Sequence, residues 1–180
     1  TSVNDVVCHG VPSATQLLRD GDIINVDITL EKHGFIADSS KMYGIGNLNP
    51  GAQALVDDCY QALWLGINAV RPGGRLGDIG FAIEQFARRK GYSVVREYCG
   101  HGLGREMHEA PQVLHYGAAG SGMILKPGMV FTIEPMLNQG SNKVKTKKDG
   151  WTVVTRDKKL SAQWEHTVAV TASGVEVLTL

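Results

Sequence analysis

The chain has 180 residues, which suits one domain with a sizeable core, and its apolar and charged fractions of 43% and 20% are ordinary for a globular protein. Lys and Arg (18) balance Asp and Glu (18), and no apolar run approaches the ~20 residues that span a bilayer, so the sequence argues against a general nucleic-acid binder and against a membrane protein. Three cysteines without CxxC spacing, Cys8, Cys59 and Cys99, favour reduced thiols in a cytoplasmic protein over a disulfide framework or a thiolate zinc site.

The first half of the chain predicts a hairpin followed by two helices. Residues 6–12 are expected to form a strand or a loop that ends in a turn. Strands are expected over 23–30 and 35–43, with a turn at 32–34 between them. The strand over 23–30 is rich in β-branched residues and is expected to be buried. Apolar residues at helical spacing predict a helix over 52–70, and Asp78 is expected to cap a second helix that ends at Gly91.

The second half of the chain predicts mainly short strands. The stretch 100–122 is rich in glycine and carries His101 and His108 without a clear element. Strands are expected over 93–98, 129–136, 151–155, 164–171 and 175–179. Because no linker or low-complexity tract interrupts the chain, the pattern indicates one α+β domain of mixed strands with two central helices.

One pattern occurs twice in the chain. Residues 17–27 align with residues 124–134: two apolar residues, a basic residue, a glycine two positions later, strand formers and a final carboxylate. Each copy is followed by a strand with another lone acid. The repeated acids are Asp27, Asp38, Glu134 and Glu165. The repeat indicates pseudo-twofold halves, about 1–90 and 91–180, with the carboxylates converging between them.

These acids together point to metal chemistry. Carboxylates that converge in a low-dielectric interior raise one another's pKa values, so they cannot all be ionised without compensation. One or two divalent cations remove this difficulty, and oxygen-rich ligation with one imidazole suits Mn, Fe or Co better than a closed tetrahedral zinc site. His101 and His108 are the imidazole candidates, because nearby glycines let the main chain crowd a site.

Less specific explanations remain open for the same residues. A lone strand Asp can be an edge or turn residue, His108 beside Glu109 can be a satisfied core pair, and His9 beside Cys8 can be packing. Cys8 and His9 also suggest a thiol nucleophile, but adjacent strand residues face opposite sides. A basic run is explained either as a solvated hairpin tip or as a contact to ribosomal RNA; it comprises Lys143, Lys145, Lys147 and Lys148.

Seven stretches are specific in combination: NDVVCHGVP (4–12), DGDIINVDIT (20–29), GFIADSSKMY (34–43), REYCGHGLGREMHEAPQV (96–113), KPGMVFTIEPM (126–136), DGWTVVTRD (149–157) and SAQWEHTVAV (161–170). With them the whole chain resembles the type I, bacterial-type methionine aminopeptidases. The resemblance implies the pita-bread fold and a single metallopeptidase catalytic domain over 1–180. It also implies removal of the initiator methionine from nascent proteins and peptides with a small second residue.

The resemblance also implies the residues of the site. It puts the ligands of two divalent metal ions (Co, Mn, Fe or Zn) at Asp27, Asp38, His101, Glu134 and Glu165. It implies attack by a metal-bridging hydroxide, with Glu134 as proton acceptor. His108 would donate to the substrate carbonyl and the oxyanion, and His9 would contact the scissile amide and help the leaving nitrogen.

Further positions match the family outside the metal ligands. Met107 and Trp151 match the surroundings of the methionine pocket. A monovalent-cation site for Na or K matches Asn4, Val6 and Ser161. The resemblance implies a monomer whose partner is the N-terminal methionine of nascent chains, with no membrane contact and with a transient ribosome contact through the basic run.

Two features depart from the family pattern. Family members carry an N-terminal segment before the position of Thr1, which supplies a helix and walls of the methionine pocket, so the chain is expected to be N-terminally short. Met107 stands where bacterial relatives often have Phe, and a flexible thioether is expected to make the pocket looser.

Two rival functions fit parts of the sequence. Prolidases and X-Pro aminopeptidases share the five ligand positions, but they lack the CHGVP stretch. A catalytically inactive pita-bread module that binds a ribosomal or protein partner is expected to have lost ligand acids, and here all five positions are filled. The short separation of Glu134 and Glu165 leaves no room for the helical insertion of the type II enzymes.

Overall fold

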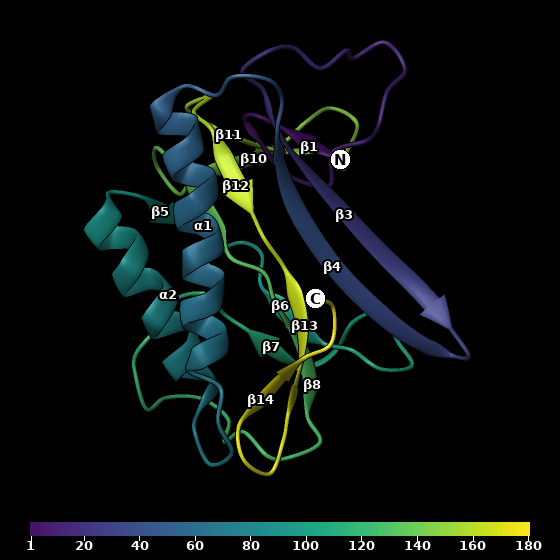
Figure 1. Cartoon of the computed structure of the whole chain (residues 1–180), viewed down its shortest axis with the longest axis vertical. Helices are drawn as coiled ribbons and strands as arrows, with labels where there is room; N and C mark the ends of the chain where they lie inside the picture. Colours follow the sequence, from purple (N-terminus) through teal and green to yellow (C-terminus); the bar gives the residue numbers. More distant parts are fainter.

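The computed structural model describes residues 1–180, and its longest strands form one hairpin. β3 (Ile23–Lys32) and β4 (Phe35–Gly44) pair antiparallel over their whole length. His33 and Gly34 between them both have positive φ, 54° and 76°, as a two-residue turn that matches the strand twist requires. β1 (Ser2–Val3) pairs with the start of β3. The hairpin projects from one side of the molecule (Figure 1).

Two helices pack against each other on the side opposite the hairpin tip (Figure 1). α1 (Pro50–Asn68) begins after Asn49, whose side chain accepts a hydrogen bond from a main-chain N–H of the first turn. α2 (Leu76–Lys90) ends at Gly91, which adopts the left-handed conformation. Neither helix is both long enough and apolar enough to cross a membrane.

The remaining strands form three antiparallel sheets, with orders β14-β13-β8-β6-β7, β12-β9-β5 and β10-β11-β2. Their bounds are β2 (Val6–Cys8), β5 (Ser93–Val94), β6 (Gly100–Gly102), β7 (Glu109–Val113), β8 (Val130–Ile133), β9 (Met136–Asn138), β10 (Val144–Thr146), β11 (Val153–Thr155), β12 (Ser161–Gln163), β13 (His166–Val170) and β14 (Val175–Val177). β8 and β9 follow each other in the chain but belong to different sheets.

The core lies between the helices and the sheets of the second half. Its main cluster holds 24 buried apolar residues, among them Leu63 of α1, Ile83 of α2 and Phe131 of β8. Full burial of such a side chain contributes roughly 1.5–3 kcal/mol. The packing therefore fixes β8, the strand that leads to Glu134, against the helices.

The largest difference from the sequence prediction concerns the strand expected over 129–136. That prediction is wrong, because β8 ends at Ile133 and β9 begins at Met136. Pro135 has no N–H to donate to a ladder, and Glu134 lies where the chain crosses from the five-stranded to a three-stranded sheet. A carboxylate expected within a strand is thus presented from a crossover.

Smaller differences concern caps and burial. Asp78 is the third residue of α2, not its cap, and its carboxylate accepts a hydrogen bond from Arg75 N at 2.9 Å. The strand expected over 93–98 is confined to β5. β3 is buried only over its first three residues, since Ile28 and Leu30 are 51% and 63% exposed. The glycine-rich stretch contains β6 and β7, which the sequence did not predict.

Candidate metal centre

Four carboxylates and an imidazole from five segments line one cavity. Asp27 and Asp38 are diagonal neighbours on one face of the long hairpin, because Thr29 pairs with Asp38 directly across β3 and β4. The second half contributes His101 in β6, Glu134 after β8 and Glu165 before β13.

The hairpin is joined to the second half beside these residues. Ser40 and Glu165 form an isolated antiparallel bridge, in which Glu165 N donates to Ser40 O at 3.0 Å. Thr167 Oγ1 donates to the main-chain oxygen of Asp38 at 2.7 Å, although the two residues are 129 positions apart. These contacts hold Asp38 close to Glu165.

The donor atoms are close enough to share a cation. One ligand atom from each of Asp38, His101 and Glu165 lies within 4.8 Å of the other two. His101 Nε2 is 3.8 Å from Asp38 Oδ2 and 3.6 Å from Glu134 Oε1. Ligand atoms that each lie about 2 Å from one ion are themselves roughly 3–4 Å apart.

The carboxylates repel one another in a partly buried setting. Burial raises the pKa of Glu134 to about 8, and the charges of Asp38 and Asp27 act in the same direction. Burial, followed by the charge of Glu134, raises the pKa of Glu165 well above its ordinary value. Burial and the charge of Asp38 raise the pKa of Asp27 to about 6. Asp27 is exposed on the cavity wall, so water screens its carboxylate from the neighbouring charges more than it screens the other three. No Lys or Arg forms an ion pair with any of the four.

Divalent cations fit these residues. Gln163 Oε1, on the cavity wall, is buried without a hydrogen-bond partner, and Gln163 Nε2 donates to Glu134 Oε2 at 3.3 Å. A cation with its bound water would satisfy this oxygen and the uncompensated carboxylates together. Four carboxylates with one imidazole form an oxygen-rich set, which suits Mn²⁺ or Fe²⁺ more than a closed zinc site.

The cavity above the carboxylates has a volume of about 740 Å³. His101 and His108, seven positions apart, meet there edge to face with ring centroids 4.4 Å apart. Burial lowers the pKa of His101. Met107 lies on the cavity wall with 42% of its surface exposed. His101 thus faces the carboxylates, and His108 stands beside it in the wall.

His9 and Trp151 form another part of the wall. Their rings stack with centroids 4.9 Å apart, and Tyr98 meets His9 edge-on at 5.4 Å. His9 has a positive φ of 58°, a conformation uncommon for a residue with a side chain. Burial lowers its pKa. His9 lies just beyond the end of β2, and its two aromatic neighbours therefore hold its ring in place.

The thiols that line the cavity are poor nucleophiles. Burial raises the pKa of Cys8 to about 12, and burial also raises the pKa of Cys99. The charge of Glu134 acts in the same direction on both thiols. Because the thiolate is the attacking form, this environment opposes the cysteine-hydrolase explanation.

The residues matched to a monovalent-cation site lie together at the strands β2 and β12. Ser161 N donates to Asn4 O at 2.9 Å, and Val6 begins β2, which contacts β12. Ser161 Oγ and Asn138 Oδ1 are both buried without a partner, and the two residues pair directly across β12 and β9. Two orphaned oxygens thus occupy neighbouring positions.

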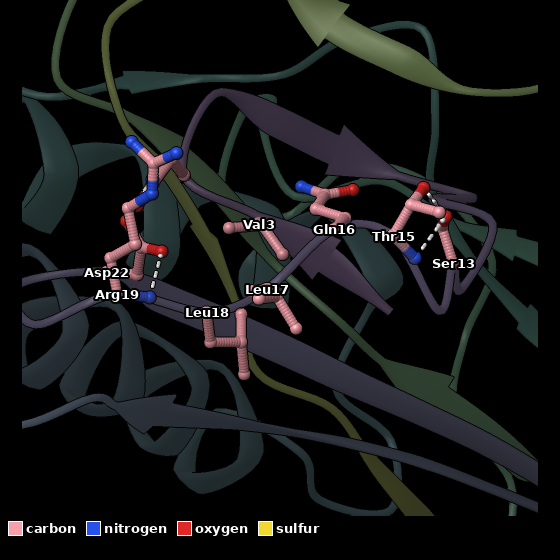
Figure 2. A pocket seen from close by; sticks show the side chains of 9 residues that line it. Val3, Ser13, Thr15, Gln16, Leu17, Leu18, Arg19 and Asp22 are labelled. Atoms are coloured by element: carbon pink, nitrogen blue, oxygen red, sulfur yellow. Dashed lines mark hydrogen bonds between the residues drawn. The ribbon is translucent and has the colours of Figure 1, made fainter.

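A second hollow, of about 810 Å³, lies beside β1 and the segment before β3 (Figure 2). Asp22 is its only carboxylate, and both oxygens are engaged: Oδ1 accepts from Asn4 Nδ2 at 2.7 Å and Oδ2 from Arg19 N at 2.9 Å. Neither imidazole nor thiol lines it. The chemistry of this fold therefore gathers in the other cavity.

The sequence missed three residues that hold Glu134. Thr132 Oγ1 donates to Glu134 Oε1 at 2.7 Å and accepts from His101 N at 3.0 Å. Gln163 donates to the other carboxylate oxygen, and His115 Nε2 accepts the Glu134 main-chain N–H at 3.1 Å. Thr132 lies two positions before Glu134 in the repeated pattern, which is a signal that could have found it. Nothing local in the sequence marks Gln163 or His115.

The chain is similar to known proteins in both sequence and fold. Residues 1–172 match metallopeptidase family M24. Methionine aminopeptidase B of Synechocystis sp. is 53% identical over the whole chain, and the methionine aminopeptidase of Salmonella typhimurium is 54% identical over 99% of it. The chain spans about two thirds of the length of these relatives, 66% and 68% respectively.

Solved structures agree with this. The crystal structure of methionine aminopeptidase from Rickettsia prowazekii covers 99% of the chain with a TM-score of 0.97 and 50% identity, and the chain covers 72% of it. Prolidase from Pyrococcus furiosus, 24% identical with a TM-score of 0.77, covers 99% of the chain and shares the fold alone. The α+β, pita-bread expectation is thereby confirmed. The chain belongs to metallopeptidase family M24, among the bacterial-type methionine aminopeptidases.

Proposed function

We propose that this domain removes the N-terminal methionine from peptides and nascent proteins with a small second residue. The observation that carries the proposal is the convergence of unpaired carboxylates from both halves of the chain on one cavity beside an imidazole. The proposed ligands of two divalent cations are Asp27, Asp38, His101, Glu134 and Glu165.

When bound, such cations lower the pKa of a water molecule and polarise the scissile carbonyl. The chain's own groups do the rest. Glu134, whose two carboxylate oxygens accept hydrogen bonds from Thr132 and Gln163, is the proposed proton acceptor. His108 donates a hydrogen bond to the substrate carbonyl oxygen, where negative charge develops. His9, held by Trp151 and Tyr98, contacts the scissile amide and assists the leaving nitrogen.

The substrate side chain would lie against the apolar part of the wall. Met107 and Trp151 both line the cavity and are 42% and 58% exposed in all, so they can cover a methionine thioether. Met107 has more rotatable bonds than the Phe that bacterial relatives often carry there. We therefore propose a pocket that tolerates small variation in the first residue of the substrate.

Several finer proposals rest on the same resemblance. Mn, Fe, Co or Zn could serve as the divalent ion, and the orphaned oxygens of Ser161 and Asn138 support a Na or K site with Asn4 and Val6. The division into half-repeats at about residue 90 and the cytoplasmic location remain predictions. Cell fractionation with antibody detection would test the location.

A transient ribosome contact remains a prediction for the basic run. Its four lysines are all exposed around β10 and the turn that follows it: Lys143, Lys145, Lys147 and Lys148. Phosphate contacts weaken steeply with salt. Co-sedimentation with ribosomes at 50 and 300 mM salt tests the contact, and a variant with all four lysines replaced by glutamate is the control. Sedimentation velocity of the protein alone tests the expected monomer.

The deciding experiment strips the metal and measures methionine release from Met-Ala-Ser with and without Mn²⁺ or Co²⁺. We expect release that requires metal and is abolished by Glu134→Gln, which keeps the shape but removes the charge of the carboxylate. Cleavage of Ala-Pro-Ala in place of Met-Ala-Ser would favour the X-Pro enzyme. Absence of both metal binding and cleavage would favour the inactive binding module.

A further inference from the structure

The crossover between β8 and β9 carries the candidate ligand Glu134, and two buried side chains hold its main chain. Glu134 lies one position beyond the ladder in which Ile133 pairs with His166, and Pro135 has no N–H. A buried main-chain N–H needs a partner. His115 Nε2 accepts the Glu134 N–H at 3.1 Å, and the thiol of Cys59 lies 3.3 Å from the Pro135 carbonyl oxygen.

His115 is itself held firmly. It is 1% exposed, lies two residues beyond β7, and directs Nε2 at the crossover. A Cβ at Gly80 of α2 would lie 2.5–2.7 Å from main-chain atoms of Leu114 and Tyr116, so the helix packs directly on the segment that carries the ring. Glu84 of α2 accepts a hydrogen bond from Gly117 N at 3.4 Å.

The acceptor role of His115 defines its tautomer. Nε2 can accept only if it carries no proton, so the proton of the neutral ring is on Nδ1. Burial lowers the pKa of His115 to about 3, which is consistent with a ring that stays neutral. The His115 imidazole has no access to the cavity, and its Nε2 already accepts a hydrogen bond. We therefore do not expect it to contact the substrate.

We infer that His115 is a positioning residue for the metal centre: by accepting the Glu134 N–H it fixes the crossover from which the Glu134 carboxylate reaches the cavity. The inference rests on the proposed function, since it takes Glu134 to be a metal ligand. Thr132 and Gln163 hold the two carboxylate oxygens, and His115 holds the main chain behind them. Partners of this kind typically alter metal affinity or activity by roughly 10–100-fold when removed.

The test compares two amides of different reach. The side-chain oxygen of His115→Gln can occupy the position of Nε2 and accept the N–H, whereas that of His115→Asn is one methylene shorter and reaches only the position of Nδ1. Mn²⁺ affinity is measured by titration calorimetry on metal-stripped protein, and kcat and KM are measured on Met-Ala-Ser. We expect His115→Asn to lower Mn²⁺ affinity and kcat by roughly tenfold or more with little change in KM, and His115→Gln to stay within about threefold of wild type.

Two results would overturn the inference: a wild-type Mn²⁺ affinity in both folded variants, or an equal loss of Mn²⁺ affinity in both. The thermal midpoint of each metal-free variant checks folding. If either variant fails to fold, ¹⁵N spectra of histidine in the unaltered protein decide, because a protonated Nε2 would contradict the acceptor role and an Nδ1–H tautomer coupled to the Glu134 amide would support it. If wild-type protein binds Mn²⁺ but releases no methionine, the proposed function is wrong. The comparison of Mn²⁺ affinities between the two variants still tests the role of His115.

Discussion

His101 Nε2 lies 3.8 Å from Asp38 Oδ2, although the two residues belong to different sheets and to opposite halves of the chain. The bridge of Ser40 with Glu165 brings the hairpin to this position. Without a cation, Asp38 contributes to the repulsion that raises the pKa values of Asp27 and Glu134. A cation bound at this cluster would therefore also stabilise the fold.

Asp38→Asn should separate these two effects. In metal-free protein it removes one repelling charge, so we expect the free energy of unfolding at pH 8 to rise by about 1 kcal/mol. Wild-type protein should gain about 2.7 kcal/mol from Mn²⁺ at 100 times its Kd, and the variant should lose most of this gain. Urea unfolding with EDTA or Mn²⁺ measures both, with Asp57→Asn on the exposed face of α1 as the matched control. Undiminished stabilisation by Mn²⁺ would remove Asp38 from the ligand set.

The pH dependence of metal-free protein follows from the raised carboxyl pKa values. Glu134 titrates near 4.5 when unfolded and at about 8 when folded, so the folded state binds more protons between these values and stability falls as pH rises. His101 and His115, whose pKa values are lowered, oppose this trend only below about pH 6.5. We therefore expect the free energy of unfolding in EDTA to fall from pH 7 to pH 8. Glu134→Gln should reduce the slope, and a rise over this window would contradict the assignment.

The cavity thiols should be dispensable and slow to react. Because burial raises the pKa of Cys8 to about 12 and raises that of Cys99, little thiolate exists at pH 7.5. We expect Cys8→Ala to keep methionine release within about threefold of wild type. The substitution removes only a small buried side chain and leaves the proposed reacting groups in place. Alkylation by iodoacetamide, followed by peptide mass spectrometry, should modify partly exposed Cys99 before buried Cys8. Loss of all activity in Cys8→Ala would instead support the hypothesis that a thiol is the nucleophile.

Gly80→Ala should destabilise the domain through the segment that carries His115. The added Cβ would lie 2.5–2.7 Å from main-chain atoms, which cannot move aside as a flexible side chain can. We expect a loss of about 1–3 kcal/mol in the free energy of unfolding. Gly51→Ala in α1 is the matched control, because the nearest atom would be 3.4 Å away, and a gain of about 0.5–1 kcal/mol is expected there. Equal effects of the two changes would show that the close packing of α2 is not the cause.

Trp151→Ala should loosen the position of the His9 ring and so weaken its proposed role at the scissile amide. The stacked indole, 4.9 Å from His9, is the largest surface that holds the imidazole in place. We expect kcat/KM on Met-Ala-Ser to fall by roughly tenfold, about 1.4 kcal/mol, and Trp151→Phe to retain most of the activity by stacking in the same way. Mn²⁺ affinity should not change in either variant, because Trp151 stacks on His9, which is not a proposed ligand. A parallel loss of metal affinity would mean that the substitution disturbs the whole cavity.

The sequence by itself predicted which acids line the cavity and the hairpin that presents two of them. The repeated pattern located Asp27, Asp38, Glu134 and Glu165, and the turn at His33-Gly34 predicted the hairpin that carries the first two. Both features depend on residues close together in the chain, where the periodicity of a strand and the φ preference of a turn act directly. The helices were predicted for the same reason, within a few residues at their ends.

Only the tertiary structure decided how these pieces meet. One strand over 129–136 was a reasonable local prediction, yet Pro135 and the pairing of β9 with β12 and β5 divide it between two sheets and leave Glu134 on the crossover. Glu134 is held by His115 and Gln163, which lie 19 and 29 positions away along the chain. Such contacts follow from the packing of α2 and the sheets, and no local propensity encodes them.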